Sequence, residues 1–328
     1  MRYLLSLAIC LSLACTKNEA PAAPEAEPTP AAESEPAPTA PAPASSTAAV
    51  EEAPPLEITA STRLISAGKE PRSAIRWRFE EGAKERLEIQ TKLSTKMPAG
   101  ESIRPAAIYG LSLEVQEVAP DGTARVAFSF DSLDVGEAAG MPEEQLARMK
   151  EALDKMKGKS GTYLLSSRGI VSEAQLQDAQ ARDQGFERLV RQLLQKTTIP
   201  VPEEEVGAGA QWAVDRSLRE AQIRIDEVTT VALKKRKGTR LALEASVAIS
   251  GEEQIITKGP GVPIGGSITM KKAKGEGTIK GRWDLRKLSP GSVEAKSSEI
   301  RTFLGPDPDG GEKAVDLQYD TTVTMRRK

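Results

Sequence analysis

Apolar and polar residues alternate along most of the chain from about residue 75 onward. In the segment "AIRWRFE", Ile75, Trp77 and Phe79 point to one side and the charged residues between them to the other, which predicts a strand with one face in water. The same alternation recurs at Leu87, Ile89 and Leu93; at Leu111, Leu113 and Val115; at Val126, Phe128 and Phe130; at Ile223 and Ile225; at Leu241, Leu243, Ala245, Val247 and Ile249; at Ile279, Gly281, Trp283 and Leu285; and at Val315, Leu317, Tyr319, Thr321, Val323 and Met325. We therefore predict about ten to twelve antiparallel strands. The strand at Leu111–Val115 and the strand at Val126–Phe130 would be joined by a hairpin turn at "APDG".

The period changes to that of a helix in the middle of the chain. In "MPEEQLARMKEALDKMK", Leu146, Met149, Leu153 and Met156 recur at spacings of three, four and three residues, which predicts one apolar stripe on a helix. A short strand, "GTYLLSS", is expected to follow it.

A second helix is predicted to begin at Ser172, where Ser172 and Gln175 occupy capping-box positions. Its apolar residues would be Leu176, Ala179, Phe186, Leu189, Val190, Leu193 and Leu194. The helical insertion is thus placed at residues 142–198.

These elements predict an α+β fold with one large curved, half-barrel-like antiparallel sheet. The apolar stripes of the two helices need a partner, and the one-sided strands supply it, so we expect the helices on the concave face. Two independent β domains with a helical connector are the alternative arrangement. In either case the folded domain would occupy residues 56–328.

The chain begins with a short apolar segment that predicts export. "MRYLLSLAICLSLA" is too short to span a bilayer as a helix and is typical of a signal peptide. Leu11, Leu13 and Ala14 lead into Cys15 and resemble a bacterial lipobox, although Ser12 departs from the usual residue. We expect residues 1–15 to be the signal region and Cys15 to be acylated. Cleavage by ordinary signal peptidase, giving a soluble secreted protein, is the alternative.

Residues 16–55 predict a disordered tether. They consist almost wholly of Ala, Pro, Glu, Ser and Thr, with ten prolines and no aromatic residue, so they bury too little to offset the entropy of ordering. Forty residues could extend to about 125 Å as polyproline. The resemblance to lipoproteins, with Thr16 after the cysteine, implies anchoring to the outer membrane on the periplasmic side.

Composition excludes several classes of chemistry. The chain has no histidine, and its two cysteines are Cys10 and Cys15, which excludes Ser-His-Asp and Cys-His catalysis and the usual zinc and haem sites. Beyond residue 55 there are 43 basic and 40 acidic residues, and aromatics make up 4% of the chain, so a nucleic-acid partner is not expected. We predict no catalytic residue, no metal and no cofactor.

Two resemblances bear on the class of protein. "ISAGKEPRSAIRWRFEEGAKERLEIQ" and "TTIPVPEEEVGAGAQWAVDRSL" resemble signatures of an uncharacterised family of exported β-rich bacterial lipoproteins, which implies relatives but no activity. The expected architecture is similar to the lipoprotein-carrier superfamily. That likeness would imply a half-open barrel that holds acyl chains under a helical lid.

Several motifs favour plain structural interpretations. "KKRKG" at 234–238 predicts a charged hairpin tip, although it could attract anionic headgroups or acidic glycan. The Gly-rich "GPGVPIGGS", the Ser66–Lys69 match to an acyl-enzyme motif, and Glu203–Glu205 are interpreted as loops and solvated turns. Asp307, Asp309 and Glu312 lack the spacing of a calcium loop and are expected to form a turn.

The most favoured function is a non-enzymatic binding module for a hydrophobic or lipid ligand at the envelope membrane. Trp77, Phe128 and Trp283 would line its cavity, and Met149 and Met156 on the amphipathic helix would cover it. An envelope scaffold that meets a protein partner and holds no small ligand is the alternative.

Overall fold

The computed structural model describes residues 60–137, 141–177, 184–220, 222–257, 262, 266–306 and 311–328. The strands are β1 (Ala60–Ser66), β2 (Lys69–Ser73), β3 (Lys84–Met97), β4 (Gly100–Val118), β5 (Ala124–Val135), β6 (Ser160–Leu165), β7 (Val171–Leu176), β8 (Val206–Ala208), β9 (Gln211–Glu220), β10 (Ile223–Lys237), β11 (Arg240–Gly251), β12 (Gln254–Ile256), β13 (Ile268–Asp284), β14 (Ser292–Pro306) and β15 (Glu312–Arg327). The helices are α1 (Glu143–Asp154) and α2 (Gln184–Thr197).

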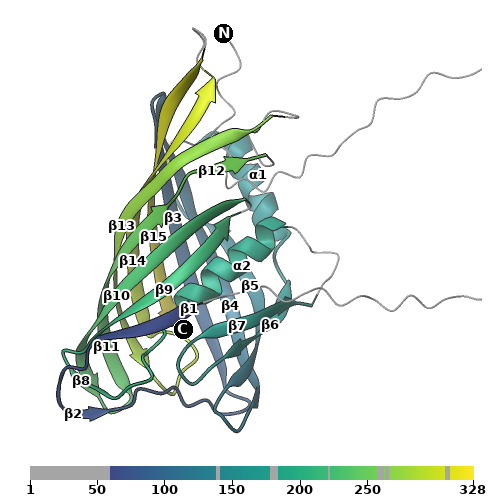
Figure 1. The fold of residues 1–328 in the computed structure, drawn as a ribbon. Helices are drawn as coiled ribbons and strands as arrows, with labels where there is room; N and C mark the ends of the chain where they lie inside the picture. Colours follow the sequence, from purple (N-terminus) through teal and green to yellow (C-terminus); the bar gives the residue numbers. More distant parts are fainter. Residues whose placement is uncertain are drawn as a thin grey trace, which may run out of the picture.

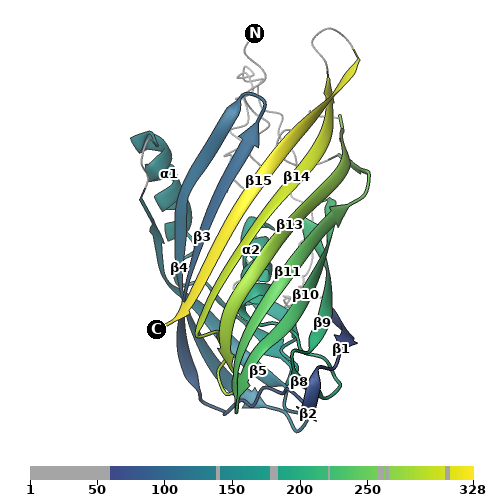
Figure 2. The ribbon, with the colours of Figure 1, turned by 90° about the vertical axis from the view of Figure 1, so that its left-hand side faces the viewer.

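One curved antiparallel sheet of 13 strands forms the body of the protein (Figures 1 and 2). Its order is β1-β9-β10-β11-β13-β14-β15-β3-β4-β5-β6-β7, with β12 paired to β13 beside this path. Because β1 and β7 stand at opposite ends of the order and do not pair with each other, the sheet stays open. The predicted α+β, half-barrel-like architecture is confirmed, with slightly more strands than expected.

The pairing of β15 with β3 joins the two ends of the chain into this single sheet. Ten residues of the last strand are in register with β3, from Gln318 opposite Lys96 to Arg327 opposite Leu87. Strands from before and after the helices therefore share one set of hydrogen bonds, which is not the arrangement of two separate β domains.

The helices flank the concave side of the sheet (Figure 1). The apolar stripe predicted for α1 is found: Leu146 and Met149 are half-buried, and Leu153 is buried. Val190, Leu193 and Leu194 of α2 are buried within the main core. The strands bury alternate residues on this side, as a sheet with one wet face requires.

The predicted start of the second helix at Ser172 is wrong. Ser172 and Gln175 lie in β7, where they pair with Leu164 and Thr162 of β6, and the helix begins at Gln184. A capping box is a local pattern, and here the hydrogen-bonded hairpin with β6 overrides it. Ala179 lies outside the described residues.

The segment 75–79 is not a strand of the sheet. Ile75 and Trp77 are buried, as the alternation predicted. The backbone N–H of Trp77 donates to Ser167, and that of Arg78 donates to Leu285. These isolated bonds attach the segment across one end of the half-barrel, so alternation here marks burial and not ladder pairing.

Candidate binding site on the concave face

The five residues predicted to contact a ligand belong to the main core. Trp77, Phe128, Met156 and Trp283 are each at most 3% exposed, and Met149 is half-buried against the same cluster. Met156 follows α1 in the chain, and Met149 lies on the helix. The structure therefore brings the five into one apolar cluster, mostly as packed residues.

The three aromatic rings of this set are packed against glycines. A Cβ atom at Gly281 would lie 2.5 Å from the Trp283 ring, and one at Gly161 would lie 2.7 Å from the Phe128 ring. Trp77 covers Gly169 in the same way, at 2.9 Å. A side chain at any of these glycines would displace a ring, so ring and glycine form a matched pair in the core.

A second apolar cluster lies further along the concave face, toward the Phe303 end of β14. Its buried members are Ile223, Ile225, Ile256, Met270, Ala273, Phe303 and Leu317. Packed against them are the partly buried Met97, Leu218, Ile249, Val262, Ile268, Val315 and Tyr319. This second cluster thus keeps apolar side chains half exposed inside the half-barrel.

A row of polar residues crosses the concave face between the two clusters. The strand register aligns Arg216 of β9 with Glu227 of β10, Gly275 of β13 with Glu299 of β14, and Glu299 with Tyr319 of β15. Ile249 of β11 connects the two halves, because it pairs with both Glu227 and Gly275. Side chains two residues apart on a strand share a face, so Arg216, Glu227, Glu299 and Tyr319, here called the polar row, face inward like the core, and Ile249 between them belongs to the second cluster.

Arg216 and Glu227 form an inward ion pair at one end of the polar row. An Nη atom of Arg216 lies 3.0 Å from a carboxylate oxygen of Glu227, and the two side chains are 8% and 16% exposed. The guanidinium also donates to the carbonyl of Gln195 on α2, at 3.3 Å. The Thr229 hydroxyl donates to the carboxylate, at 3.1 Å. The pair therefore connects α2 to the sheet.

Glu299 forms the second inward pair, with Arg301 two residues further along β14. The guanidinium donates to both carboxylate oxygens, at 2.6 and 3.1 Å, and the two side chains are 12% and 11% exposed. The Arg301 guanidinium lies 5.1 Å from the centre of the Tyr319 ring, a cation–π contact. Both Arg–Glu pairs are charge-balanced, which is how buried charges are tolerated.

These features together form an amphiphilic surface. The half-exposed residues of the second cluster offer apolar contact, and the adjoining polar row offers donors and acceptors of both charges.

Two buried polar atoms of the main core have no hydrogen-bond partner in the described part of the protein: the Tyr163 hydroxyl and the Trp283 Nε1. Burial raises the pKa of Tyr163 above its usual range, and the nearby charge of Glu85 adds to that effect. Burial alone raises the pKa of Tyr109 to about 12. Both phenols are therefore neutral under physiological conditions.

The remaining sequence motifs fall in turns and strand ends. "KKRKG" closes the β10–β11 hairpin, with Gly238 at φ +58° in the turn. Ser66 ends β1 and Lys69 begins β2, so the Ser-x-x-Lys match is not on a helix. Glu203 lies in a turn, where its backbone carbonyl accepts a hydrogen bond from Arg76.

Cys15, Asp307, Asp309 and most of "GPGVPIGGS" lie outside the described residues. Within the described ranges, no group of three or more acidic or cysteine side chains could hold a metal ion. Neither helix of that part combines the length and hydropathy of a membrane-spanning helix.

Sequence reasoning missed the polar row. One signal was present: Arg216 occupies an inward position of a strand whose other inward residues, Trp212 and Val214, are apolar.

No protein-family model matches the chain, and no curated protein matches it significantly.

Proposed function

We propose that the half-barrel is a non-enzymatic binding module for an amphiphilic, lipid-like ligand. The observation that supports this is the second cluster, whose half-exposed apolar side chains adjoin the polar row on the concave face. An acyl chain would lie against the second cluster, where each buried methylene contributes about 0.8 kcal/mol. The headgroup would lie at the polar row.

In this proposal the five residues first predicted as ligand contacts take a supporting role. Trp77, Phe128, Met156 and Trp283 form the packed base of the half-barrel. Met149, half-buried on α1, is the member of the set that a bound chain could still contact. The flexible thioether would adapt to chains of different shape.

Titration with a dansyl-labelled undecanoic acid tests the proposal. The full chain is expected to enhance the dansyl fluorescence, and Ile249→Glu should weaken binding at least about tenfold by placing a charge against the acyl chain. Ile300→Glu is the matched control, because Ile300 is 43% exposed and lies on the opposite face of β14. No enhancement with the wild-type chain, or equal loss in both variants, would contradict the proposal.

We further propose that the module is tethered to the outer membrane through acylated Cys15. Metabolic labelling with a palmitate analogue in the wild type and in Cys15→Ala tests this step. Label in the wild type alone supports the anchor, and equal label in both excludes it.

An envelope scaffold is the second candidate, favoured by the open sheet edge at β1. An unpaired edge can accept a strand from a partner, and Ile65 on this strand is 48% exposed. A photo-cross-linker at residue 65 would capture a partner in cells if the scaffold function holds. Absence of any cross-linked protein would contradict it.

A further inference from the structure

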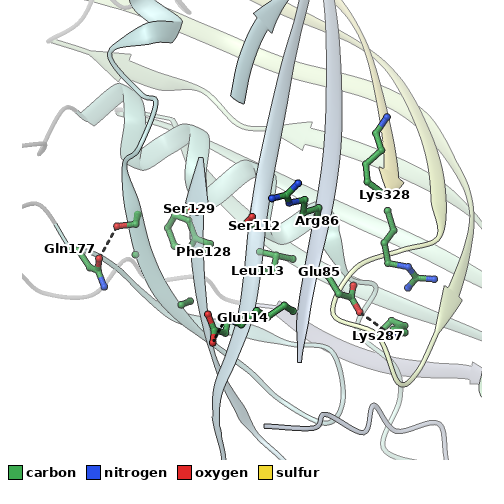
Figure 3. Close-up of a pocket in the computed structure, with 15 residues that line it drawn as sticks. Glu85, Arg86, Ser112, Leu113, Glu114, Phe128, Ser129, Gln177, Lys287 and Lys328 are labelled. Atoms are coloured by element: carbon green, nitrogen blue, oxygen red, sulfur yellow. Dashed lines mark hydrogen bonds and ion pairs between the residues drawn. The ribbon is translucent and has the colours of Figure 1, made fainter. Parts of the chain in front are cut away.

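A groove on the outer face of the sheet, opposite the concave site, has its own polar lining (Figure 3). Its volume is about 750 Å³, and it runs over β3, β4, β5 and β6 beside the last residues of the chain. Its side chains include Arg86, Ser112, Ser129, Ser160 and Gln177. A space of this size could hold a small saccharide or a headgroup.

The lining follows the strand register. Arg86 of β3 pairs with Ser112 of β4, Ser112 with Ser129 of β5, and Ser129 with Ser160 of β6. Beyond β3, the backbone N–H of Lys328 donates to the carbonyl of Arg86. One guanidinium and three hydroxyl groups thus stand in a row across four neighbouring strands, on the face opposite the core.

The hydroxyl groups of this row are oriented by neighbouring acceptors. Ser112 and Ser129 both donate to the carboxylate of Asp131, the Ser129 bond being 2.7 Å long. Ser160 donates to the side-chain oxygen of Gln177, also at 2.7 Å. Because each hydroxyl proton is already engaged, the serine oxygens present lone pairs and suit a ligand that brings its own donors.

The three lysines of the groove each lie within ion-pair distance of a carboxylate. Lys84 pairs with Glu114 at 3.2 Å, and Lys287 lies 3.9 Å from the buried carboxylate of Glu85. Lys328 pairs with Glu88 at 2.8 Å.

Arg86 is exposed and, in contrast to the lysines, unpaired within the described part of the chain. Its guanidinium makes no hydrogen bond or ion pair with any described residue. Arg327, at the same end, donates to the backbone carbonyl of Ser289 and to no carboxylate among the described residues. The Arg86 guanidinium is therefore available to an anionic group of a ligand, and planar guanidinium suits carboxylate and phosphate alike.

We propose that this outer groove binds an acidic saccharide. A carboxylate or phosphate of the sugar would bind Arg86, and sugar hydroxyls would donate to Ser112 and Ser129. The groove lacks exposed aromatic side chains among its lining residues, which fits polar recognition through hydrogen bonds. The site is independent of the amphiphile site, because it lies on the other face of the sheet.

Calorimetry on the full chain tests the proposal with tetragalacturonic acid and glucose 6-phosphate as probes. At least one of the two is expected to bind, and the one that binds distinguishes carboxylate from phosphate as the preferred anion. Arg86→Gln should weaken that binding about tenfold or more, the usual effect of losing a charged hydrogen bond. Lys92→Gln, an exposed residue of the same strand outside the groove, is the matched control and should change binding less than about twofold.

Two further probes separate sugar recognition from charge attraction. Maltotetraose is a sugar without an acidic group, and tetraglutamate is acidic without a sugar. The Ser112→Ala, Ser129→Ala double variant should weaken binding of the acidic saccharide and leave the weak binding of tetraglutamate unchanged. Thermal unfolding of each variant checks that it is folded. No binding of either acidic probe, equal binding of tetraglutamate, or equal losses in Arg86→Gln and Lys92→Gln would overturn the proposal.

Discussion

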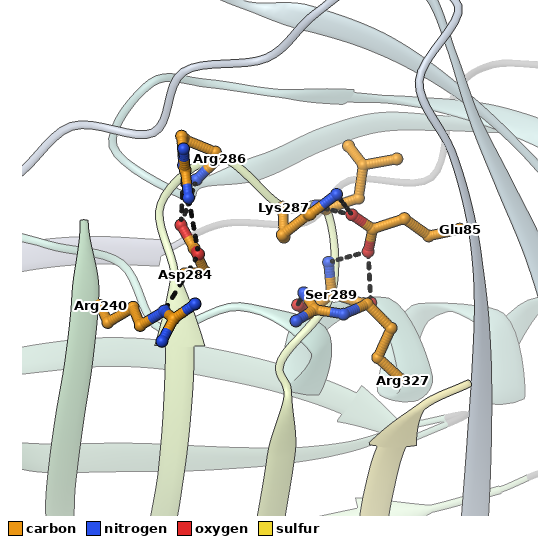
Figure 4. Close-up of polar contacts among 8 residues, drawn as sticks. Glu85, Arg240, Asp284, Arg286, Lys287, Ser289 and Arg327 are labelled. Atoms are coloured by element: carbon orange, nitrogen blue, oxygen red, sulfur yellow. Dashed lines mark hydrogen bonds and ion pairs between the residues drawn. The ribbon is translucent and has the colours of Figure 1, made fainter.

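The carboxylate of Glu85 accepts hydrogen bonds from both the backbone N–H and the hydroxyl of Ser289, at 3.1 and 2.6 Å, although the two residues lie 204 positions apart (Figure 4). The backbone N–H of Leu288 donates to the same carboxylate, at 3.2 Å. Glu85 is 8% exposed and Leu288 is 2% exposed. One buried carboxylate at the start of β3 therefore fixes the turn between β13 and β14.

Replacing this carboxylate should destabilise the protein strongly. Glu85→Ala leaves two N–H groups and one hydroxyl without their acceptor in a buried place, and we expect a loss of about 2–4 kcal/mol in the free energy of unfolding. Urea denaturation measures it. Glu114→Ala, which removes an exposed pair with Lys84, is the control, with an expected loss below about 1 kcal/mol. Equal losses would show that the Glu85 contacts add nothing.

The ion pair between Arg216 and Glu227 should behave as a unit. Glu227→Gln leaves the inward guanidinium uncompensated and is expected to cost about 3–5 kcal/mol. The double variant Arg216→Met, Glu227→Met should recover most of that loss, because it leaves no unpaired charge. Glu244→Gln, in the exposed pair with Lys234, is the control and should cost less than about 1 kcal/mol. In a double-mutant cycle of Arg216→Met, Glu227→Met and the double variant, the absence of coupling energy would contradict the expectation.

Asp284 should make part of the stability acid-sensitive. Partial burial would raise the pKa of its carboxyl, but hydrogen bonds with Arg286 and Thr239 and the charge of Arg286 outweigh it and lower the pKa from 3.8 to about 2. A depressed pKa in the folded state means that the stabilisation is present above the unfolded value and is lost as pH falls through the folded one. The difference in unfolding free energy between the wild type and Asp284→Asn should therefore shrink between pH 3.8 and about 2. A difference independent of pH in denaturant titrations would refute this.

The hydroxyl of Tyr163 should be dispensable. It is buried without a hydrogen-bond partner among the described residues, so Tyr163→Phe is expected to leave stability unchanged or raise it by about 1 kcal/mol. Thr198→Val is the contrasting variant, because that buried hydroxyl donates to the carbonyl of Gly169 at 2.7 Å, and it should destabilise by about 1–2 kcal/mol. A clear loss of thermal stability in Tyr163→Phe would show that the phenol has a partner, such as a bound molecule.

The sequence predicted the strands well, because alternation reports directly on which side chains are buried. Leu241, Leu243 and Ala245 are buried on β11 as the pattern required. The same rule could not tell that Ile75 and Trp77 lie in a segment outside the ladder. Burial produces alternation wherever a chain is extended, whether or not a neighbouring strand pairs with it.

The polar row could not be predicted from the sequence, for a different reason. It depends on the register of six strands. Alternation shows which face of the sheet a residue occupies, but not which residues of neighbouring strands it pairs with. Glu227 and Glu299 are 72 positions apart in the numbering and come onto one line only through the pairings of Ile249 and Gly275. Charged residues at inward positions were the available signal, and their partners required the structure.

β3 has one buried face and one exposed face, which limits how its length can change. Glu85, Leu87 and Ile89 are buried on one side, while Arg86 faces the outer groove on the other. Inserting one residue ahead of Arg86 would exchange the two faces and expose the apolar set to water. Insertions or deletions within β3 that keep the fold should therefore come in steps of two residues, or be absorbed by a bulge such as the one between Thr91 and Leu93. The β3–β4 turn, which belongs to neither face, is free to lengthen by single residues.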